Sequence, residues 1–276
     1  MPLLSVPQPY DFHLSTTRFR AFGRDAANVW HEDGLHRVIA GREVRIEAAP
    51  GGVSVEPLDD EIAPVVQHLL GVPFDLEAFR AWAAGDPLLA RIEERLRGLR
   101  PPLAADPFET LVTSITAQQV SLFSAFAVRS RLIKTFGERH GVVWSFPAPE
   151  RLVDVPEDDL LAVGFSRRKA EYVISLARRV AELRELASLP DEEVKAHITS
   201  LRGLGEWTAD WFLARHLARP RAWPAGDLGL RKAVSAFYGG GRVLSTEEVR
   251  ALGPRFEPFQ NLTAHYLLAA SQLGVS

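Results

Sequence analysis

Two glycines separated by a single residue are the first candidates for binding chemistry in this sequence. Gly203 and Gly205 flank Leu204 and stand directly before residues 206–213, whose composition predicts a helix. Glycine has no Cβ, so it accepts a positive φ and lets the backbone approach another surface closely. The first N–H groups of the following helix lack intrahelical partners and lie at the positive end of its dipole. The spacing predicts a phosphate site, although a plain turn between two helices uses glycine in the same way.

A carboxylate follows further along the chain. Asp227 comes after the stretch Trp223 to Gly226 and directly before a predicted helix that begins at Leu228. Aspartate is a preferred N-cap, because its side-chain oxygen accepts a hydrogen bond from a free N–H of the first helical turn. We therefore expect Asp227 to cap this helix, which holds the carboxylate fixed and ionised.

The composition is that of an ordinary water-soluble protein and excludes several kinds of chemistry. Hydrophobic residues make up 46% and charged residues 24% of the chain, and no stretch approaches the roughly 20 apolar residues of a membrane span. The N-terminus lacks the features of a secretion signal, so we expect a cytoplasmic protein with no membrane partner. The absence of cysteine excludes disulfides, thiol nucleophiles and iron–sulfur clusters. The eight histidines show no metal spacing, so no metal site is expected.

The charge and the hydrophobic pattern describe the surface and the framework. The net charge of −3 argues against a broadly basic face, so any DNA-binding surface must be local and made largely of backbone amides. Alternating apolar residues between Phe12 and about Pro57 predict an antiparallel sheet. Helical spacing begins near Ile62 to Leu70, and Pro101-Pro102 interrupts it. We place a domain boundary there, with an α+β domain over 1–100 and a helical domain over 101–276.

Helix capping signals are frequent after Pro102. Asp106, Pro107 and Glu109 have the types and order of an N-cap, a first helical residue and the partner of a capping box. Ser121 and Ser245 are further predicted N-caps. A last helix is expected over about Pro258 to Leu273, so the chain is predicted to be mainly α.

Taken together, these residues resemble the helix-hairpin-helix glycosylase superfamily, and within it the 3-methyladenine DNA glycosylase II family. The likeness covers nearly the whole chain and implies two helical subdomains with a cleft between them, together with an N-terminal α+β domain that contains an antiparallel sheet. Besides the hairpin at about 198–215 and Asp227, it includes Pro9-Tyr10-Asp11-Phe12, Phe108-Glu109 with Ile115, Gln118-Gln119-Val120-Ser121 and Arg168-Lys169-Ala170-Glu171.

The resemblance implies an enzyme of base excision repair that rotates a damaged nucleotide out of the duplex. It would hydrolyse the N-glycosidic bond of alkylated purines of the 3-methyladenine and 7-methylguanine type. Asp227 matches the family's catalytic aspartate, which stabilises the oxocarbenium-like charge on the sugar. Trp207 stands where bifunctional relatives carry a Schiff-base lysine. The expected product is therefore an abasic site, without lyase cleavage of the strand.

The resemblance also assigns binding roles. Trp207 and Trp211 match aromatic residues of the base pocket, where cation–π stacking would select a cationic purine, although core packing explains either residue alone. Leu268 stands where relatives can carry another tryptophan. Gln119 matches the side chain that fills the gap left by the flipped base, a position that is apolar in some relatives. Gly203, Gly205 and Thr208 would bind DNA phosphates.

The expected partner is double-stranded DNA that contains alkylated bases, bound by a monomer. No cofactor is expected, although hairpins of this family sometimes hold a monovalent cation on backbone carbonyls. Two alternatives stay open. One is a glycosylase for oxidised or deaminated purines, and the other is a noncatalytic helix-hairpin-helix protein that recognises distorted DNA and needs no carboxylate.

Overall fold

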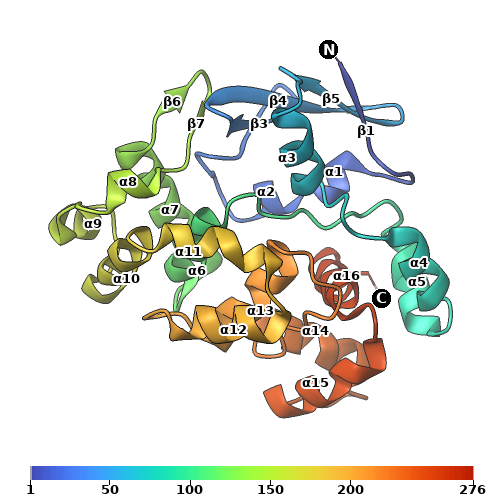
Figure 1. Cartoon of the computed structure of the whole chain (residues 1–276). Helices are drawn as coiled ribbons and strands as arrows, with labels where there is room; N and C mark the ends of the chain where they lie inside the picture. Colours follow the sequence, from blue (N-terminus) through green and yellow to red (C-terminus); the bar gives the residue numbers. More distant parts are fainter. Residues whose placement is uncertain (1, 276) are drawn as a thin grey trace.

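The computed structural model describes residues 2–275, which form an N-terminal sheet and a larger assembly of helices (Figure 1). Five antiparallel strands lie in the order β1-β5-β4-β3-β2. This confirms the predicted antiparallel sheet. The strands are β1 (Leu3–Ser5), β2 (Val29–His31), β3 (Gly34–Ile39), β4 (Arg42–Ala49) and β5 (Gly52–Glu56).

Helix α3 (Ile62–Leu69) covers one face of the sheet (Figure 1). Alternate side chains of β4 and β5 point to this face and are fully buried, among them Val44 and Ile46. They meet Ile62 and Val66, which lie one turn apart on α3. The first hydrophobic core therefore lies between the sheet and this helix.

Part of the predicted strand region is helical. Residues Phe12–Ser15 form α1 and residues Arg18–Ala21 form α2. The expectation of strands from Phe12 onward was wrong here, because Asp11 caps α1 by accepting a hydrogen bond from the N–H of Leu14. The sequence prediction also omitted β1, which adds to the edge of the sheet along β5.

The helices after α3 share a second core. Most buried apolar residues from Phe74 onward belong to it, whereas the sheet core extends to Leu70. The packing therefore divides between Leu70 and Phe74, well before the predicted boundary at Pro101-Pro102. The reason is that α16 returns the C-terminus to pack against α5. The helices are α4 (Leu76–Ala83), α5 (Pro87–Arg95), α6 (Pro107–Ala117), α7 (Leu122–Phe136), α8 (Pro149–Leu152), α9 (Glu157–Ala162), α10 (Arg167–Ala177), α11 (Val180–Glu185), α12 (Asp191–Ser200), α13 (Glu206–Arg215), α14 (Leu228–Tyr238), α15 (Thr246–Leu252) and α16 (Gln260–Leu273).

A buried ionic network joins the sheet to these helices. Glu109 on α6 pairs with Arg37 of β3 and with Arg129 of α7, at 2.6 Å in the second case. Arg129 also contacts Asp25, at 3.3 Å. The predicted capping box at α6 is therefore only half present: Asp106 caps the N–H of Glu109, but the Glu109 carboxylate is committed to the two guanidinium groups. Their charges hold the pKa of Glu109 at about 2, below its usual range and despite its burial.

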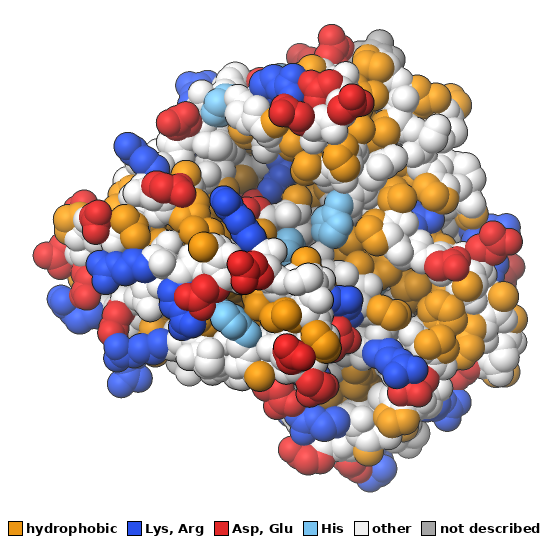
Figure 2. Space-filling model, viewed as in Figure 1, with side chains coloured by type: hydrophobic (Ala, Val, Ile, Leu, Met, Phe, Trp, Pro, Cys, Tyr) orange, Lys and Arg blue, Asp and Glu red, His pale blue; other side chains and the backbone are white. Residues whose placement is uncertain are grey.

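The distribution of charged side chains on the surface is consistent with the small net charge. On the face in Figure 2, acidic and basic side chains are intermixed and no continuous basic patch is present. None of the helices within residues 2–275 is long and apolar enough to cross a membrane.

Candidate active site

The glycine hairpin connects α12 to α13. Gly203 has φ +84°, and a Cβ at this position would lie 2.1 Å from the ring of Tyr172. Only glycine fits both the backbone conformation and this close approach. Leu204, between the glycines, is 6% exposed and anchors the turn in the helical core. The predicted hairpin is present, and its first glycine is required by packing.

The hairpin presents free backbone amides. The N–H groups of Gly203 and Gly205 donate no hydrogen bond to any residue between 2 and 275, and Gly205 is exposed at the N-cap of α13. Thr208 was predicted to join them on a phosphate, and the structure argues against this. Its side chain is 2% exposed and shares a hydrogen bond with Ser114 at 3.0 Å, while its N–H donates to the Gly205 carbonyl.

A second loop lies beside the hairpin. The side-chain amide of Gln118 donates to the Gly203 carbonyl at 2.7 Å, and Lys169 Nζ donates to the Gln118 carbonyl, also at 2.7 Å. Gln119, the next residue, is exposed and has φ +56°, a backbone conformation that costs free energy for a residue with a Cβ. The structure thus holds Gln118 inward and Gln119 outward.

Apolar surface surrounds this exposed glutamine. Val120, Leu122 and Phe123 are 45%, 44% and 65% exposed, respectively. Phe123 lies edge-on to Phe22 of the N-terminal region, with 6.3 Å between the ring centroids. No sequence signal distinguishes Phe123, since its neighbours predict an ordinary helix start and only the fold reveals its exposure.

Asp227 is the N-cap of α14, as predicted. Its Oδ1 accepts a hydrogen bond from the N–H of Leu230 at 2.8 Å. Its Oδ2 accepts from both indole groups, Nε1 of Trp207 at 3.0 Å and Nε1 of Trp211 at 3.1 Å. The structure therefore brings the predicted aspartate and both predicted tryptophans together, although the aspartate caps α14 and the tryptophans lie on α13.

Three donors and a helix N-terminus give Asp227 a defined chemical character. The three hydrogen bonds hold the carboxylate in one orientation at the positive end of the helix dipole. Such a group is a fixed anion that stabilises nearby positive charge without moving. Leu268 lies close to Asp227. A Cβ added to Gly229 would be 3.1 Å from Asp227 Oδ1 and 3.3 Å from the Leu268 side chain.

The two tryptophans differ in their surroundings. Trp211 is 6% exposed, and the Arg215 guanidinium lies over its ring, with 3.5 Å from Cζ to the centroid. His265 of α16 packs edge-on against it at 5.7 Å. Trp207 is more exposed. Trp207, Trp211 and Arg215 are four residues apart each time, which puts all three on one face of α13. No motif of the sequence marks Arg215, so only the structure reveals its contact with Trp211.

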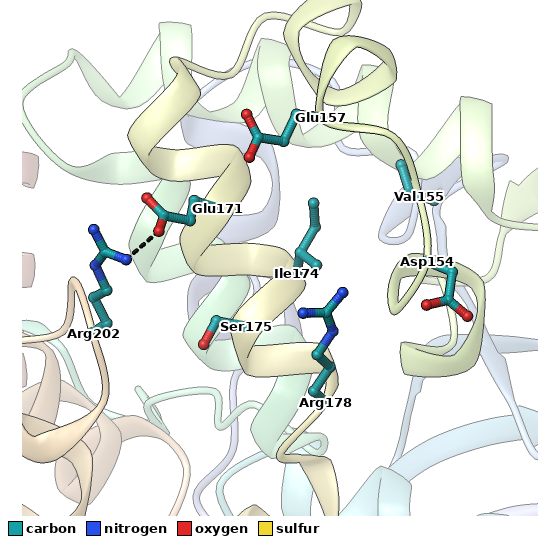
Figure 3. A pocket seen from close by; sticks show the side chains of 8 residues that line it. All are labelled: Asp154, Val155, Glu157, Glu171, Ile174, Ser175, Arg178 and Arg202. Atoms are coloured by element: carbon teal, nitrogen blue, oxygen red, sulfur yellow. Dashed lines mark hydrogen bonds and ion pairs between the residues drawn. The ribbon is translucent and has the colours of Figure 1, made fainter.

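A separate groove lies over α10. It encloses about 450 Å³ and is lined by Glu171, Arg178, Arg202 and neighbouring residues, with Arg202 and Glu171 paired across it (Figure 3). None of the predicted catalytic or base-pocket residues lines this groove. The arrangement at Asp227 is therefore the stronger candidate for a reaction centre.

Comparison with known proteins identifies the family of this chain. The sequence model of the HhH-GPD superfamily of base excision DNA repair proteins matches residues 112–257. The Escherichia coli DNA-3-methyladenine glycosylase 2 is 31% identical over 197 residues, which is 70% of this chain and 64% of that protein. The chain thus matches slightly less than two thirds of that relative's length.

Two solved structures are similar. A 3-methyladenine DNA-glycosylase from Archaeoglobus fulgidus superposes with a TM-score of 0.89 over 99% of both chains, at 26% identity. The Schizosaccharomyces pombe 3-methyladenine DNA glycosylase Mag1, in complex with abasic DNA, superposes with a TM-score of 0.63 over 70% of this chain and 96% of its own, at 25% identity. This chain belongs to the HhH-GPD superfamily of base excision DNA repair proteins.

Proposed function

We propose that the protein is a monofunctional DNA glycosylase of base excision repair. It hydrolyses the N-glycosidic bond of alkylated purines of the 3-methyladenine and 7-methylguanine type in double-stranded DNA and leaves an abasic site. The observation that carries the proposal is the Asp227 carboxylate, which two indole N–H groups and a helix N-terminus hold in place.

The chemistry of bond cleavage explains why this arrangement suits the reaction. As the bond from C1′ to the base breaks, positive charge builds on the sugar, as in other glycoside hydrolyses. A fixed carboxylate beside the sugar stabilises this charge more strongly in the transition state than in the ground state. An N3- or N7-alkylated purine is already cationic and departs as a neutral molecule, so no general acid is needed.

Hydrolysis without strand cleavage follows from the residue at the Schiff-base position. A lyase needs an amine there to attack the sugar, and this chain has Trp207, whose indole N–H is engaged with Asp227. Borohydride treatment during the reaction should therefore trap no covalent protein–DNA adduct. A trapped adduct would favour the oxidised-purine glycosylase alternative.

The hairpin and the neighbouring loop bind the DNA. The free N–H groups of Gly203 and Gly205 suit a backbone phosphate, and Gln119 is exposed where it can fill the gap left by a flipped base. Because Gln118 bonds to the Gly203 carbonyl, the two elements are held together. The protein needs no partner subunit for these contacts, so we expect a monomer, whose molar mass light scattering would measure. We expect it to act in the cytoplasm.

The decisive experiment measures release of free bases from methylated duplex DNA by the wild-type protein and by Asp227→Asn. With about 4 Å between the carboxylate and the sugar charge and an effective dielectric constant of about 20, the attraction is about 4 kcal/mol, or roughly a thousandfold in rate. Asn is also a good N-cap, so the variant should fold and bind DNA. Undiminished release by Asp227→Asn would refute the proposal, and binding without any release by the wild type would favour a noncatalytic DNA-recognition protein.

A further inference from the structure

The ammonium group of Lys169 is bound by backbone rather than by a carboxylate. Lys169 lies in the first turn of α10, and its side chain is partly buried. Among the described residues, the acceptors of its hydrogen bonds are the carbonyls of Thr116, at 3.1 Å, and Gln118, at 2.7 Å. Burial lowers the pKa of Lys169, so a charged group at this position needs the two carbonyls to offset its loss of water. Lys169 is therefore part of the packing around this loop.

The two carbonyls belong to the end of another helix. Thr116 lies in the last turn of α6, and Gln118 is the C-cap of that helix. The last carbonyls of a helix lack intrahelical partners and lie at the negative end of its dipole, where a cation is favourable. Lys169 thus satisfies two acceptors of α6 from α10, which packs against it.

The Gln118 carbonyl is half of the peptide unit that leads to Gln119. The orientation of this peptide plane is set by ψ of Gln118, which is 126°, and by φ of Gln119, which is +56°. Glycine usually occupies a left-handed position at the end of a helix, whereas Gln119 carries a Cβ. Such a conformation persists only where its surroundings hold it. The hydrogen bond from Lys169 holds the plane in the orientation that leaves Gln119 exposed.

The same helix supports the glycine hairpin. Tyr172 follows Lys169 by three residues and so lies on the same face of α10. Its ring lies against Gly203, where an added Cβ would come within 2.1 Å of it. The Gln118 side chain connects the two sites, because its amide donates to the Gly203 carbonyl at 2.7 Å. One face of α10 therefore supports both the loop that presents Gln119 and the hairpin.

We propose that Lys169 is a positioning residue for base flipping. Its ammonium group fixes the peptide between Gln118 and Gln119, so the Gln119 side chain is already in place to fill the gap when the damaged nucleotide rotates out of the duplex. Without Lys169 this loop would have to be ordered during flipping, which costs free energy. The inference rests on the proposed function and names a residue that supports it. Lys169 acts through Gln119 and does not take part in cleavage of the N-glycosidic bond.

A direct contact with a DNA phosphate is the other role open to an ammonium group near this loop. We favour positioning, because two of the three N–H donors of Lys169 are engaged with carbonyls. The two roles differ in their dependence on Gln119. A phosphate contact contributes whichever side chain stands at position 119, and it also contributes to binding of undamaged duplex. A positioning role disappears when the Gln119 side chain is removed.

The test is a double-mutant cycle of Lys169→Met and Gln119→Ala. Met keeps the unbranched stem of lysine and removes its donors. The measurements are single-turnover release of 7-methylguanine from duplex DNA at saturating protein, and the fluorescence of a 2-aminopurine beside the damaged base, which rises on unstacking. Lys169→Met should slow release about 10- to 100-fold, the contribution of hydrogen bonds to a charged group, and reduce the rise in fluorescence. In the Gln119→Ala protein the same substitution should change the rate by less than about twofold.

Two further variants serve as controls. Arg168→Met removes an equal charge from an exposed side chain one residue earlier, and it should keep the wild-type rate at saturating protein. Lys169→Arg keeps donors for the carbonyls and should recover most of the rate that Lys169→Met loses. Both variants of Lys169 should bind undamaged duplex as the wild type does. Thermal melting checks that each variant is folded.

The outcomes separate this inference from the proposed function. A full rate in Lys169→Met, or an equal loss in the Gln119→Ala protein, would overturn the positioning role while leaving the glycosylase intact. Weaker binding of Lys169→Met to undamaged duplex would overturn it in favour of a phosphate contact. Absence of any base release by the wild type would instead remove the proposed function itself. The 2-aminopurine fluorescence needs no bond cleavage, so it would still test the role of Lys169 in that case.

Discussion

The two hairpin glycines should respond in opposite ways to the same substitution. At Gly203, an added Cβ would meet the Tyr172 ring at 2.1 Å, and φ is +84°. The left-handed backbone costs an L-residue about 1–2 kcal/mol and overpacking adds about 1–3 kcal/mol, so Gly203→Ala should lose about 2–5 kcal/mol of stability. For a chain of this length, that lowers Tm by roughly 5–15 °C.

At Gly205 the same methyl group meets nothing within 4 Å. The backbone angles, φ −125° and ψ −175°, are an extended conformation that alanine adopts freely. Gly205→Ala should therefore fold normally and gain about 0.4–1 kcal/mol through the unfolded state. Its methyl group, however, occupies the space through which a phosphate would approach the free N–H, so DNA affinity should fall about tenfold or more, which is the loss of one charged hydrogen bond.

Thermal melting and fluorescence anisotropy on an abasic duplex measure the two effects separately. Gly203→Ala should lose Tm, and Gly205→Ala should lose affinity at unchanged or raised Tm. The affinity loss should shrink at high salt, where phosphate contacts contribute less. Unchanged affinity in Gly205→Ala would refute the phosphate role of the hairpin, and a stable Gly203→Ala would refute the packing argument.

Three further predictions concern the network, the carboxylate and the loop. Glu109→Gln should cost about 3–5 kcal/mol in urea denaturation, because it leaves buried guanidiniums unpaired. The pKa of Glu109 is about 2 in the folded protein, against an ordinary value of 4.5. The contribution of the Glu109 carboxylate to folding stability is therefore present above pH 4.5 and lost toward pH 2. The wild type should lose this stability over that interval, and a similar loss in Glu109→Gln would contradict the prediction. Trp211→Phe removes one donor to Asp227 and should slow excision about tenfold at unchanged circular dichroism, and an unchanged rate would argue against the second indole contact. Gln119→Gly should raise stability by about 1 kcal/mol, since φ is +56°, yet slow excision from duplex DNA; a faster rate would refute the gap-filling role.

Local chemistry determined what the sequence could predict of the fold. The N-caps at Asp106, Ser121 and Ser245 are all present, because a cap depends on residues within one turn of it. The short helices α1 and α2 were missed, since helices of four residues carry too few positions for a periodic pattern. The packing boundary after Leu70 was missed because it depends on α16, which is distant in sequence.

In the candidate site as well, contacts within one helix followed from the sequence, and contacts between helices did not. Trp207 and Trp211 lie one helical turn apart, so their common face followed from the spacing. That both indoles donate to one oxygen of Asp227 did not follow, because the loop between α13 and α14 sets that distance. Thr208 looked equally suitable for a phosphate, but the hydrogen bond to Ser114 of α6 turns it inward. Such contacts between distant helices carry no sequence signal within either one.

The N-terminal region also helps to position the proposed site, through contacts between segments that are distant in sequence. Glu109 fixes α6 to β3 through Arg37 and to α7 through Arg129, and the loop that presents Gln119 lies between these two helices. A shift of α6 relative to the sheet would therefore move the loop away from the hairpin glycine to which Gln118 is bonded. The buried network thus couples the position of the sheet to that of the loop that presents Gln119.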